Sequence, residues 1–427
     1  MSATLEDWLA RLEARHPRTI ELGLERVGKV AGRLLSGPPA KRVISVAGTN
    51  GKGSTVAFLE SIAAAGGWRV GAYTSPHLLR YNERVRIDGR EVDDADLVEA
   101  FEAVEAARGD VPLTYFESGT LAAAWLFERA GLDLAILEVG LGGRLDAVNL
   151  FDADCAIITT VDLDHQDWLG ADIEAIGFEK AGIARPWKPL VLGDDDPPAS
   201  VLRHAYAIGA SSWRIANDFF AEPLDDGHWR WREVGFEMRL PMPGLAAPVQ
   251  LRNAACAIAA LRAIGFEADE SIWSRGVAGA RLPARLQRFE RDGIEIRVDV
   301  GHNPQAARAL AAALAAMPAA RTIAVHAALA DKDAAGVVAA LRGVVDGWII
   351  AGTTAAGARG TSAHALAARL PADLAILALA EDVDAGIDHA LATATAGDRV
   401  LVFGSFRAAE RALKRFAATG AGEARGL

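Results

Sequence analysis

A glycine-rich segment near the N-terminus, VISVAGTNGKGST at residues 43–55, constrains the fold of this chain most strongly. Its first residues are nearly all apolar, which is typical of a strand buried on both faces. Three glycines then allow a tight turn and a close approach of the backbone to a ligand, and Lys52 adds a positive charge. Ser54 stands where a helix begins, and a helix N-terminus offers N–H groups and a positive dipole end to phosphate. The segment therefore predicts a strand, a phosphate-binding loop and a helix.

The loop is a variant of the common nucleotide-binding sequence G-x-x-x-x-G-K-[ST]. It is shorter than that sequence, and Gly53 separates Lys52 from Ser54. The alternative is a glycine-rich turn that binds nothing. We favour nucleotide binding because strand, loop, lysine, hydroxyl and helix follow one another in the required order.

The chain alternates apolar strand and helix patterns, and its 427 residues are enough for two or three domains with their own cores. The predicted fold class is α/β, with an N-terminal phosphate-loop parallel-sheet domain, a small accessory β region and a C-terminal Rossmann-like α/β domain. We expect the first domain at residues 1–287, with an accessory antiparallel sheet at about 213–250, and the second at 288–427. In the second domain we expect strands at 294–300, 321–328, 347–351, 373–377 and 398–403.

Charge and cysteine content argue against several classes of protein. A net charge of −11 argues against a general nucleic-acid binder. Cys155 and Cys256 lie in apolar segments, which fits two buried thiols in a reducing cytoplasm better than a disulfide framework. The N-terminus has no signal-peptide core, and no apolar run reaches membrane-spanning length. We therefore expect a cytoplasmic protein that binds neither nucleic acid nor membrane.

Polar residues follow the predicted strands of the first domain, among them Ser75, Glu138 and His165. Ligands of parallel α/β sheets lie at the carboxyl ends of the strands, so these three side chains should lie together. Their oxygen and nitrogen atoms can hold Mg²⁺ beside nucleotide phosphates. Each residue alone also has a structural explanation: a turn before Pro76, a carboxylate paired with Arg144, or a satisfied polar histidine.

Lys180 follows in the sequence EKAGI and admits two interpretations. The default is a lysine in an ion pair or on a solvated helix face. The functional alternatives are a phosphate contact or a lysine carboxylated by CO₂, because a buried lysine can lose its proton. The sequence leaves all of these open.

In the second domain the sequence DVGHNP ends one strand and opens a helix. Asn303 as N-cap and Pro304 in the first turn have structural explanations. Asp299 and His302 do not, so they are candidate ligand contacts.

Together these motifs resemble the folylpolyglutamate synthases of the Mur ligase superfamily. The resemblance covers residues 18–410, and the opening TIELGLERV is most similar to the bacterial bifunctional dihydrofolate synthase/folylpolyglutamate synthases. The motifs that carry it are AGTNGKGS, TSPHL with NERV, TYFE, EVGLGGRLDA, LDHQDWLG, EKAGI, DVGHNP, DKD and FGSF.

The resemblance implies a monomeric, ATP-dependent amide ligase with an ATP-binding first domain and a glutamate-ligase second domain. It would add L-glutamate to 7,8-dihydropteroate, making dihydrofolate, and to reduced folates, making folylpolyglutamates. We expect two Mg²⁺ sites. A phosphate loop with Mg²⁺ positions the γ-phosphoryl group for transfer to the substrate carboxylate. We therefore expect an acyl-phosphate intermediate, with ADP and inorganic phosphate as products.

The resemblance also implies roles for individual residues. Those matching ATP contacts are Thr49, Asn50, Gly51, Lys52, Gly53, Ser54, Asn253, Arg285 and Asp299. Those matching metal ligands are Ser54, Ser75, Glu138, His165 and Lys180, the last as a carboxylated lysine. Those matching pterin-binding segments are Ile20, Glu21, Leu22, Thr114, Tyr115, Phe116, Glu117, Leu145, Asp146 and Ala147. The candidate catalytic residues are Lys52, His165, Lys180 and His302, with His302 a candidate base for the glutamate amine.

The chain departs from the family pattern in three places. The family sequence PGRFQ reads PARLQ at 283–287, which bears on the backbone around Arg285. DVAHNP reads DVGHNP, and residues 205–250 resemble no motif of the family.

Three other functions remain open from the sequence. A monofunctional folylpolyglutamate synthase shares the same motifs. A peptidoglycan ligase would need a UDP-binding domain, and only 47 residues precede Gly48. A phosphate-loop ATPase switch would not need Glu138, His165 and Lys180 together.

Overall fold

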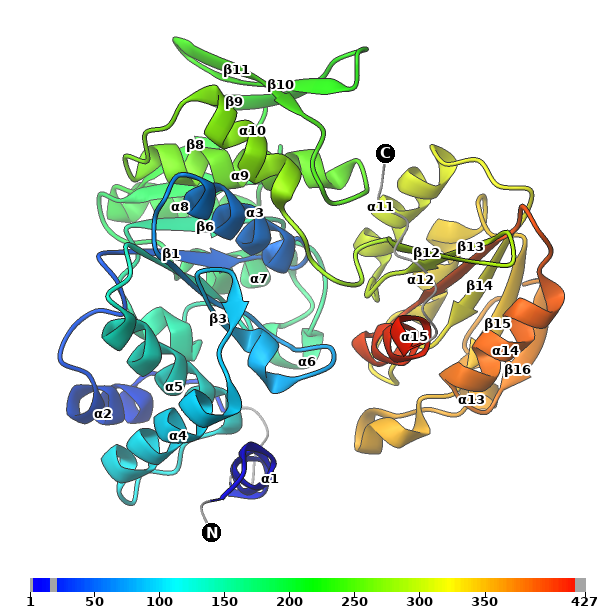
Figure 1. Cartoon of the computed structure of the whole chain (residues 1–427), viewed down its shortest axis with the longest axis horizontal. Helices are drawn as coiled ribbons and strands as arrows, with labels where there is room; N and C mark the ends of the chain where they lie inside the picture. Colours follow the sequence, from blue (N-terminus) through cyan, green and yellow to red (C-terminus); the bar gives the residue numbers. More distant parts are fainter. Residues whose placement is uncertain (1–2, 16–20, 419–427) are drawn as a thin grey trace. The chain divides into compact units, whose positions relative to one another are not determined.

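The computed structural model describes residues 3–15 and 21–418, which form two compact units (Figure 1). Unit 1 comprises Met1–Gly244 and Gln250–Arg281, and unit 2 comprises Leu245–Val249 and Leu282–Leu427. The expectation that residues 1–287 and 288–427 act as the two functional domains stays a prediction.

Unit 1 is built on an eight-stranded sheet in the order β4-β3-β2-β5-β1-β6-β7-β8. Neighbouring strands in the series β2-β5-β1-β6-β7-β8 are parallel. At one edge of the sheet, β3 pairs with β2 and β4 pairs with β3 in antiparallel fashion. The strands are β1 (Arg42–Ala47), β2 (Val70–Tyr73), β3 (Val85–Ile87), β4 (Arg90–Glu91), β5 (Leu134–Glu138), β6 (Cys155–Ile158), β7 (Pro189–Leu192) and β8 (Ser211–Arg214). The central strands β1 and β5 are buried nearly throughout, as expected for a parallel sheet covered on both faces.

Helices cover this sheet, and their ends follow local sequence signals. Asp93 caps α4 by accepting from the Asp96 N–H, and Gly131 ends α5 in the left-handed conformation. The helices are α1 (Leu5–Arg15), α2 (Glu25–Leu34), α3 (Lys52–Ala65), α4 (Asp94–Arg108), α5 (Tyr115–Ala130), α6 (Gln166–Leu169), α7 (Ile173–Ala181), α8 (Ala199–Ile208), α9 (Val249–Ala263) and α10 (Glu270–Gly279), with 3-10 turns η1 (Tyr81–Arg84) and η2 (Ala147–Leu150).

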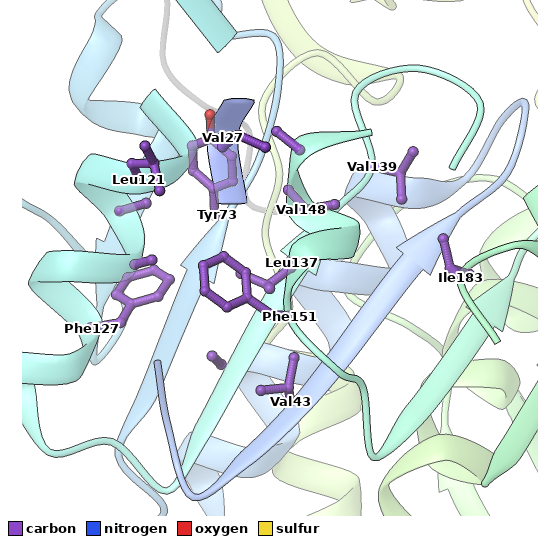
Figure 2. Packing of buried hydrophobic residues seen from close by; sticks show 14 of the residues in the cluster. Val27, Val43, Tyr73, Leu121, Phe127, Leu137, Val139, Val148, Phe151 and Ile183 are labelled. Atoms are coloured by element: carbon purple, nitrogen blue, oxygen red, sulfur yellow. The ribbon is translucent and has the colours of Figure 1, made fainter. Parts of the chain in front are cut away.

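The core of unit 1 lies between α5 and the sheet. Figure 2 shows Leu121 and Phe127 from α5 in one apolar cluster with Tyr73 from β2 and Leu137 from β5. All four side chains are at most 1% exposed. Burial of such side chains is the main stabilising contribution to the domain and keeps the carboxyl edge of the sheet fixed.

The accessory region forms a three-stranded antiparallel sheet in the order β11-β10-β9, as predicted. Its strands are β9 (Phe219–Pro223), β10 (His228–Glu233) and β11 (Phe236–Pro241). The predicted start at 213 is wrong, because Trp213 lies in β8, which pairs with β7 in the main sheet. The sheet packs onto α9, where the Trp231 indole donates to the Ala255 carbonyl over 3.2 Å.

Unit 2 contains a six-stranded sheet in the order β12-β13-β17-β14-β15-β16, parallel except for β12. The strands are β12 (Gln287–Arg291), β13 (Ile294–Val298), β14 (Thr322–His326), β15 (Gly347–Ala351), β16 (Ile376–Ala380) and β17 (Arg399–Phe403). Its helices are α11 (Pro304–Ala315), α12 (Ala334–Leu341), α13 (Ala363–Ala367), α14 (Val383–Thr393) and α15 (Phe406–Ala418), with the 3-10 turn η3 (Thr354–Arg359).

One strand prediction in unit 2 needs correction, and one strand was not predicted. The strand predicted at 373–377 begins at Ile376, because a turn from Pro371 to Leu374 precedes it. The edge strand β12 has a mostly polar sequence in which only Phe289 is buried, so no apolar run marked it.

The α/β architecture confirms the predicted fold class. Among the described residues, no helix is both long and apolar enough to cross a membrane.

Candidate functional site

The phosphate loop joins the central strand β1 to α3 and depends on two glycines. Gly48 has φ 146° and Gly51 has φ 88°, a region that side chains rarely adopt. A Cβ at Gly48 would also collide with the Thr159 hydroxyl. Both positions therefore require glycine for conformational and steric reasons.

The end of β6 holds the loop in place. The Thr159 hydroxyl donates to the Asn50 carbonyl over 2.6 Å. The Thr49 N–H donates to the Thr160 carbonyl over 2.8 Å, and the Asn50 N–H donates to the Thr160 hydroxyl over 3.1 Å. Sequence reasoning missed both threonines, although two adjacent hydroxyls at the end of a predicted strand could have signalled them.

The start of α3 fits a bound phosphate. Gly51 is its N-cap and supplies no side-chain hydrogen bond to the first turn. The Lys52 ammonium donates to the Gly48 carbonyl over 2.8 Å, which places a positive charge over the loop. Ser54 and Thr55 are buried in the first turn, and the Thr55 hydroxyl has no hydrogen-bond partner in the described structure. Gly53, the second residue of α3, separates these hydroxyls from Lys52.

Ser75 and Glu138 meet at the same edge of the sheet. The Ser75 N–H donates to Glu138 Oε2 over 3.1 Å, and Glu138 is 5% exposed at the end of β5. The alternative pairing of Glu138 with Arg144 is wrong, because Arg144 forms its ion pair with Glu179 over 2.8 Å.

Lys180 is buried near the end of α7 and is 4% exposed. Burial, with a smaller contribution from the Lys52 charge, lowers the pKa of Lys180 to about 7, and Asp164 opposes this shift. Its ammonium makes no ion pair or hydrogen bond with another residue described here. The default interpretation of a solvated or ion-paired lysine is therefore wrong.

His165 is exposed and adopts φ 52°, and its N–H donates to Asp164 Oδ1 over 2.8 Å. Within the described ranges, no group of three or more His, Cys, Asp or Glu side chains is arranged to hold a metal. The predicted ligand set contains only two residues of these types, so this result does not test it. The oxygens of Ser54, Ser75 and Glu138 are hard donors of the kind that Mg²⁺ prefers, so the residues fit that ion.

The three predicted pterin-binding segments are joined to one another. The Gly23 N–H, next to Leu22, donates to the Leu145 carbonyl over 3.2 Å. Arg26 pairs with Glu21 over 2.6 Å and with Glu117 over 2.9 Å. Sequence reasoning missed Arg26, because only tertiary contacts reveal that it links two of the segments. Ile20 lies outside the described residues.

Gly140 packs closely against the side chains of Phe116 and Asp146. A Cβ at Gly140 would lie 2.8 Å from the Phe116 ring and 3.3 Å from Asp146 Oδ2. Asp146 is buried and accepts from the Leu141 and Val148 N–H groups, and desolvation raises its pKa to about 7.

The other predicted pterin-segment residues lie next to these. Thr114 caps α5 and forms a capping box with Glu117. The ring of Tyr115 lies under the Arg84 guanidinium at 5.5 Å. Ala147 is the first residue of η2 and is buried.

Asn253 lies in the second turn of α9 and faces the phosphate loop. Its Oδ1 is 2.6 Å from where a Cβ of Gly51 would be. Its Nδ2 donates to Gln250 Oε1 over 2.9 Å, and both side chains are 4% exposed. The structure therefore brings Asn253 to the loop that begins two hundred residues earlier in the chain.

In unit 2, Asp299 organises the predicted nucleotide segment. It accepts from the Leu286 N–H over 2.9 Å and from the Gly301 N–H over 2.7 Å. Burial raises its pKa, and the nearby Arg285 charge opposes the rise. Ala284, where the family has glycine, keeps a left-handed φ of 54°.

His302 lies beside this segment, with Nδ1 3.0 Å from the Val300 carbonyl. Asn303 caps α11 by accepting from the Ala306 N–H, as predicted. Most of the described site residues thus lie in loops at strand ends or in the first two turns of a helix, whereas Lys180 lies near the end of α7.

Two family profiles match the chain. Residues 46–261 match the Mur ligase middle domain, and residues 284–406 match the Mur ligase glutamate ligase domain.

The chain is similar to named proteins and to proteins of known structure. The chain is 46% identical over 407 residues to the dihydrofolate synthase/folylpolyglutamate synthase of Escherichia coli K12, covering 95% of this chain and 94% of the relative. It is 39% identical to the Haemophilus influenzae enzyme of the same name, covering 95% and 96%. The structure of E. coli FolC in complex with DHPP and ADP matches with a TM-score of 0.92 and 44% identity, covering 98% of this chain and 99% of that chain. A bifunctional folylpolyglutamate synthase/dihydrofolate synthase with Mn, AMPPNP and L-glutamate bound matches with a TM-score of 0.89 and 43% identity, covering 97% and 98%.

Proposed function

Because this chain belongs to the Mur ligase family, we propose that it is a dihydrofolate synthase/folylpolyglutamate synthase. It uses ATP and a divalent metal to add L-glutamate to 7,8-dihydropteroate and to reduced folates. The related structures bind ADP or AMPPNP, Mn, DHPP and L-glutamate, which supports each of these ligands. The observation that carries the proposal is the convergence of the phosphate loop, Glu138 and Lys180 at one edge of the sheet.

The uncapped start of α3 and Lys52 bind the phosphates of ATP and hold the γ-phosphoryl group for in-line attack by the substrate carboxylate. The attack forms an acyl phosphate and releases ADP. The glutamate amine then attacks the acyl carbon and expels inorganic phosphate, which completes the amide bond. Lys52 stabilises the negative charge on the transferred group.

Asn253 in unit 1 is a further candidate nucleotide contact, and the resemblance makes Arg285 and Asp299 in unit 2 candidates as well. Asn253 lies against Gly51, which supports its contact with the same nucleotide as the loop. His302 is the candidate base for the glutamate ammonium.

Ser54, Ser75, Glu138, His165 and carboxylated Lys180 would hold the metal ions, at two sites. A bound Mg²⁺ neutralises charge on the phosphoryl group. A neutral lysine amine adds to CO₂ to give a carbamate and one proton. At pH 7 about half of a lysine population with a pKa of about 7 is neutral, against roughly one in 3,000 at the ordinary pKa of 10.5.

The pterin ring binds where the three segments meet, with Phe116 as a stacking surface and Asp146 as a polar anchor. Arg26 belongs to this site because it fixes Glu21 and Glu117 relative to each other. Buried free thiols at Cys155 and Cys256 support a reducing, cytoplasmic location, and we expect a monomer.

The experiment that tests the mechanism uses 7,8-dihydropteroate labelled with ¹⁸O in its carboxylate. One label should appear in the released phosphate. Label in AMP, or none in phosphate, would exclude an acyl phosphate. Repeating the assay with tetrahydrofolate and unlabelled glutamate shows whether both activities reside in this chain.

A further inference from the structure

A buried ion pair joins the phosphate-loop helix to β3. Glu60 lies on α3, about two turns beyond Ser54. Both of its oxygens accept from the Arg86 guanidinium. Nη2 donates to Oε2 over 2.7 Å, and Nε donates to Oε2 over 3.0 Å and to Oε1 over 3.2 Å. The two side chains are 10% and 17% exposed. This bidentate geometry fixes β3 relative to α3.

The third guanidinium nitrogen reaches the loop that carries Ser75. Arg86 Nη1 donates to the Glu83 carbonyl over 2.9 Å and to the Thr74 hydroxyl over 3.3 Å. The Thr74 N–H also donates to the Arg84 carbonyl over 2.9 Å. Arg86 therefore ties both ends of the segment 74–83 to α3.

The segment between these ends is held as a rigid turn. The Glu83 carboxylate accepts from the N–H groups of Leu78, Leu79 and Arg80 over 2.7, 2.6 and 2.8 Å. At the other end the Ser75 N–H donates to Glu138. Because the turn is held from within, the Arg86 tether acts together with the Glu138 contact to hold Ser75 relative to the phosphate loop.

We propose that Glu60 and Arg86 are positioning residues that set the distance between Ser75 and the first turn of α3, and thereby the affinity for the divalent metal. The inference rests on the proposed function, which places the metal between these two elements. A buried ion pair adds little net stability, because desolvation offsets the attraction between its charges. Replacement by an apolar pair should therefore keep the fold but release the turn.

The test compares two double variants, E60L/R86M and the control E233L/R262M. The control pair has similar burial, at 15% and 24% exposed, and joins α9 to the accessory sheet. Binding of Mn²⁺ in the presence of AMPPNP is measured by electron paramagnetic resonance, and stability is measured by urea unfolding. We expect Mn²⁺ affinity to fall by at least about tenfold in E60L/R86M and to stay within about twofold of the parent in the control, with similar stability in both.

Unchanged Mn²⁺ affinity in E60L/R86M overturns the proposal, and so does an equal loss in the control. If E60L/R86M does not fold, R86K decides by the same comparison, because lysine keeps the charge but cannot make all five bonds of the guanidinium. Its Mn²⁺ affinity should fall by at least about threefold, and parent-like affinity overturns the proposal. A parent protein that binds Mn²⁺ and AMPPNP but forms no amide product would instead refute the proposed function alone.

Discussion

Lys180 in unit 1 and His326 in unit 2 are both buried basic side chains near the carboxyl edge of a parallel sheet. Burial lowers the pKa of each, to about 7 for Lys180 and about 4 for His326. Neither makes an ion pair with another residue in the described parts of the chain. They differ in their surroundings.

Lys180 is close enough to Lys52 and Asp164 for their charges to act on it. His326 packs against the rings of Phe403 at 4.8 Å and Trp348 at 6.1 Å, and neither ring nitrogen has a hydrogen-bond partner. Burial alone therefore does not mark a functional residue. The neighbours do: Lys180 lies near the phosphate-loop lysine and an aspartate, whereas His326 is enclosed by aromatic rings and its pKa is lowered further only by the Arg369 charge.

The largest expected effect comes from Lys180→Ala. We expect kcat/KM to fall by about 10³-fold, or roughly 4 kcal/mol, because a metal ligand is lost while the fold survives. Added acetate or formate should restore part of the activity by supplying a carboxylate. Full activity without rescue, or an unmodified amine in a metal-loaded crystal, would refute carboxylation.

His326 should instead govern acid stability. Its folded pKa of about 4 lies below the unfolded 6.5, so the folded state binds fewer protons. Keeping this histidine neutral therefore contributes up to about 3 kcal/mol to the free energy of unfolding. This contribution is fully present above pH 6.5 and is lost as the pH falls from 6.5 toward 4. His326→Ile should flatten the unfolding free energy over this range and leave turnover at pH 8 unchanged.

The matched control is His389→Gln, because His389 is exposed on α14. This variant should keep the parent's dependence of unfolding free energy on pH. If the unfolding free energy of His326→Ile depends on pH as strongly as that of the parent, the aromatic surroundings do not hold the histidine neutral.

Lys52→Ala tests the charge that acts on Lys180. We expect a loss of more than about 2 kcal/mol in transition-state stabilisation, measured as kcat/KM, because the loop loses the charge beside the transferred phosphoryl group. Lys41→Ala is the control, since that side chain is 70% exposed in an ion pair with Asp133. Near-normal turnover of Lys52→Ala would refute the role assigned to the loop.

The smallest effect concerns Ala284, which adopts φ 54° where the family has glycine. A left-handed alanine costs roughly 1–2 kcal/mol, so Ala284→Gly should stabilise unit 2 by about 1 kcal/mol after the added entropy of the unfolded chain. Chemical denaturation measures this change. Loss of stability would mean that packing of the buried methyl group outweighs the backbone strain.

Local patterns predicted much of the fold and of the site. The phosphate loop, the strand ends at Glu138 and Asp299 and the cap at Asn303 were recognised because each depends on neighbours in the sequence. The strand β12 and the position of Trp213 in the main sheet were not, because strand pairing joins distant segments whose own patterns are weak.

The α/β alternation, the glycine loop and the order of the motifs can be read from local sequence, since backbone sterics and the periodicity of apolar residues set them. The burial of Lys180, the packing of Thr159 and Asn253 against the loop and the link that Arg26 makes between two pterin segments become visible only in the folded chain. Burial and side-chain partnership are properties of packed surfaces. Residues far apart in the chain create those surfaces, so no single stretch of sequence contains them.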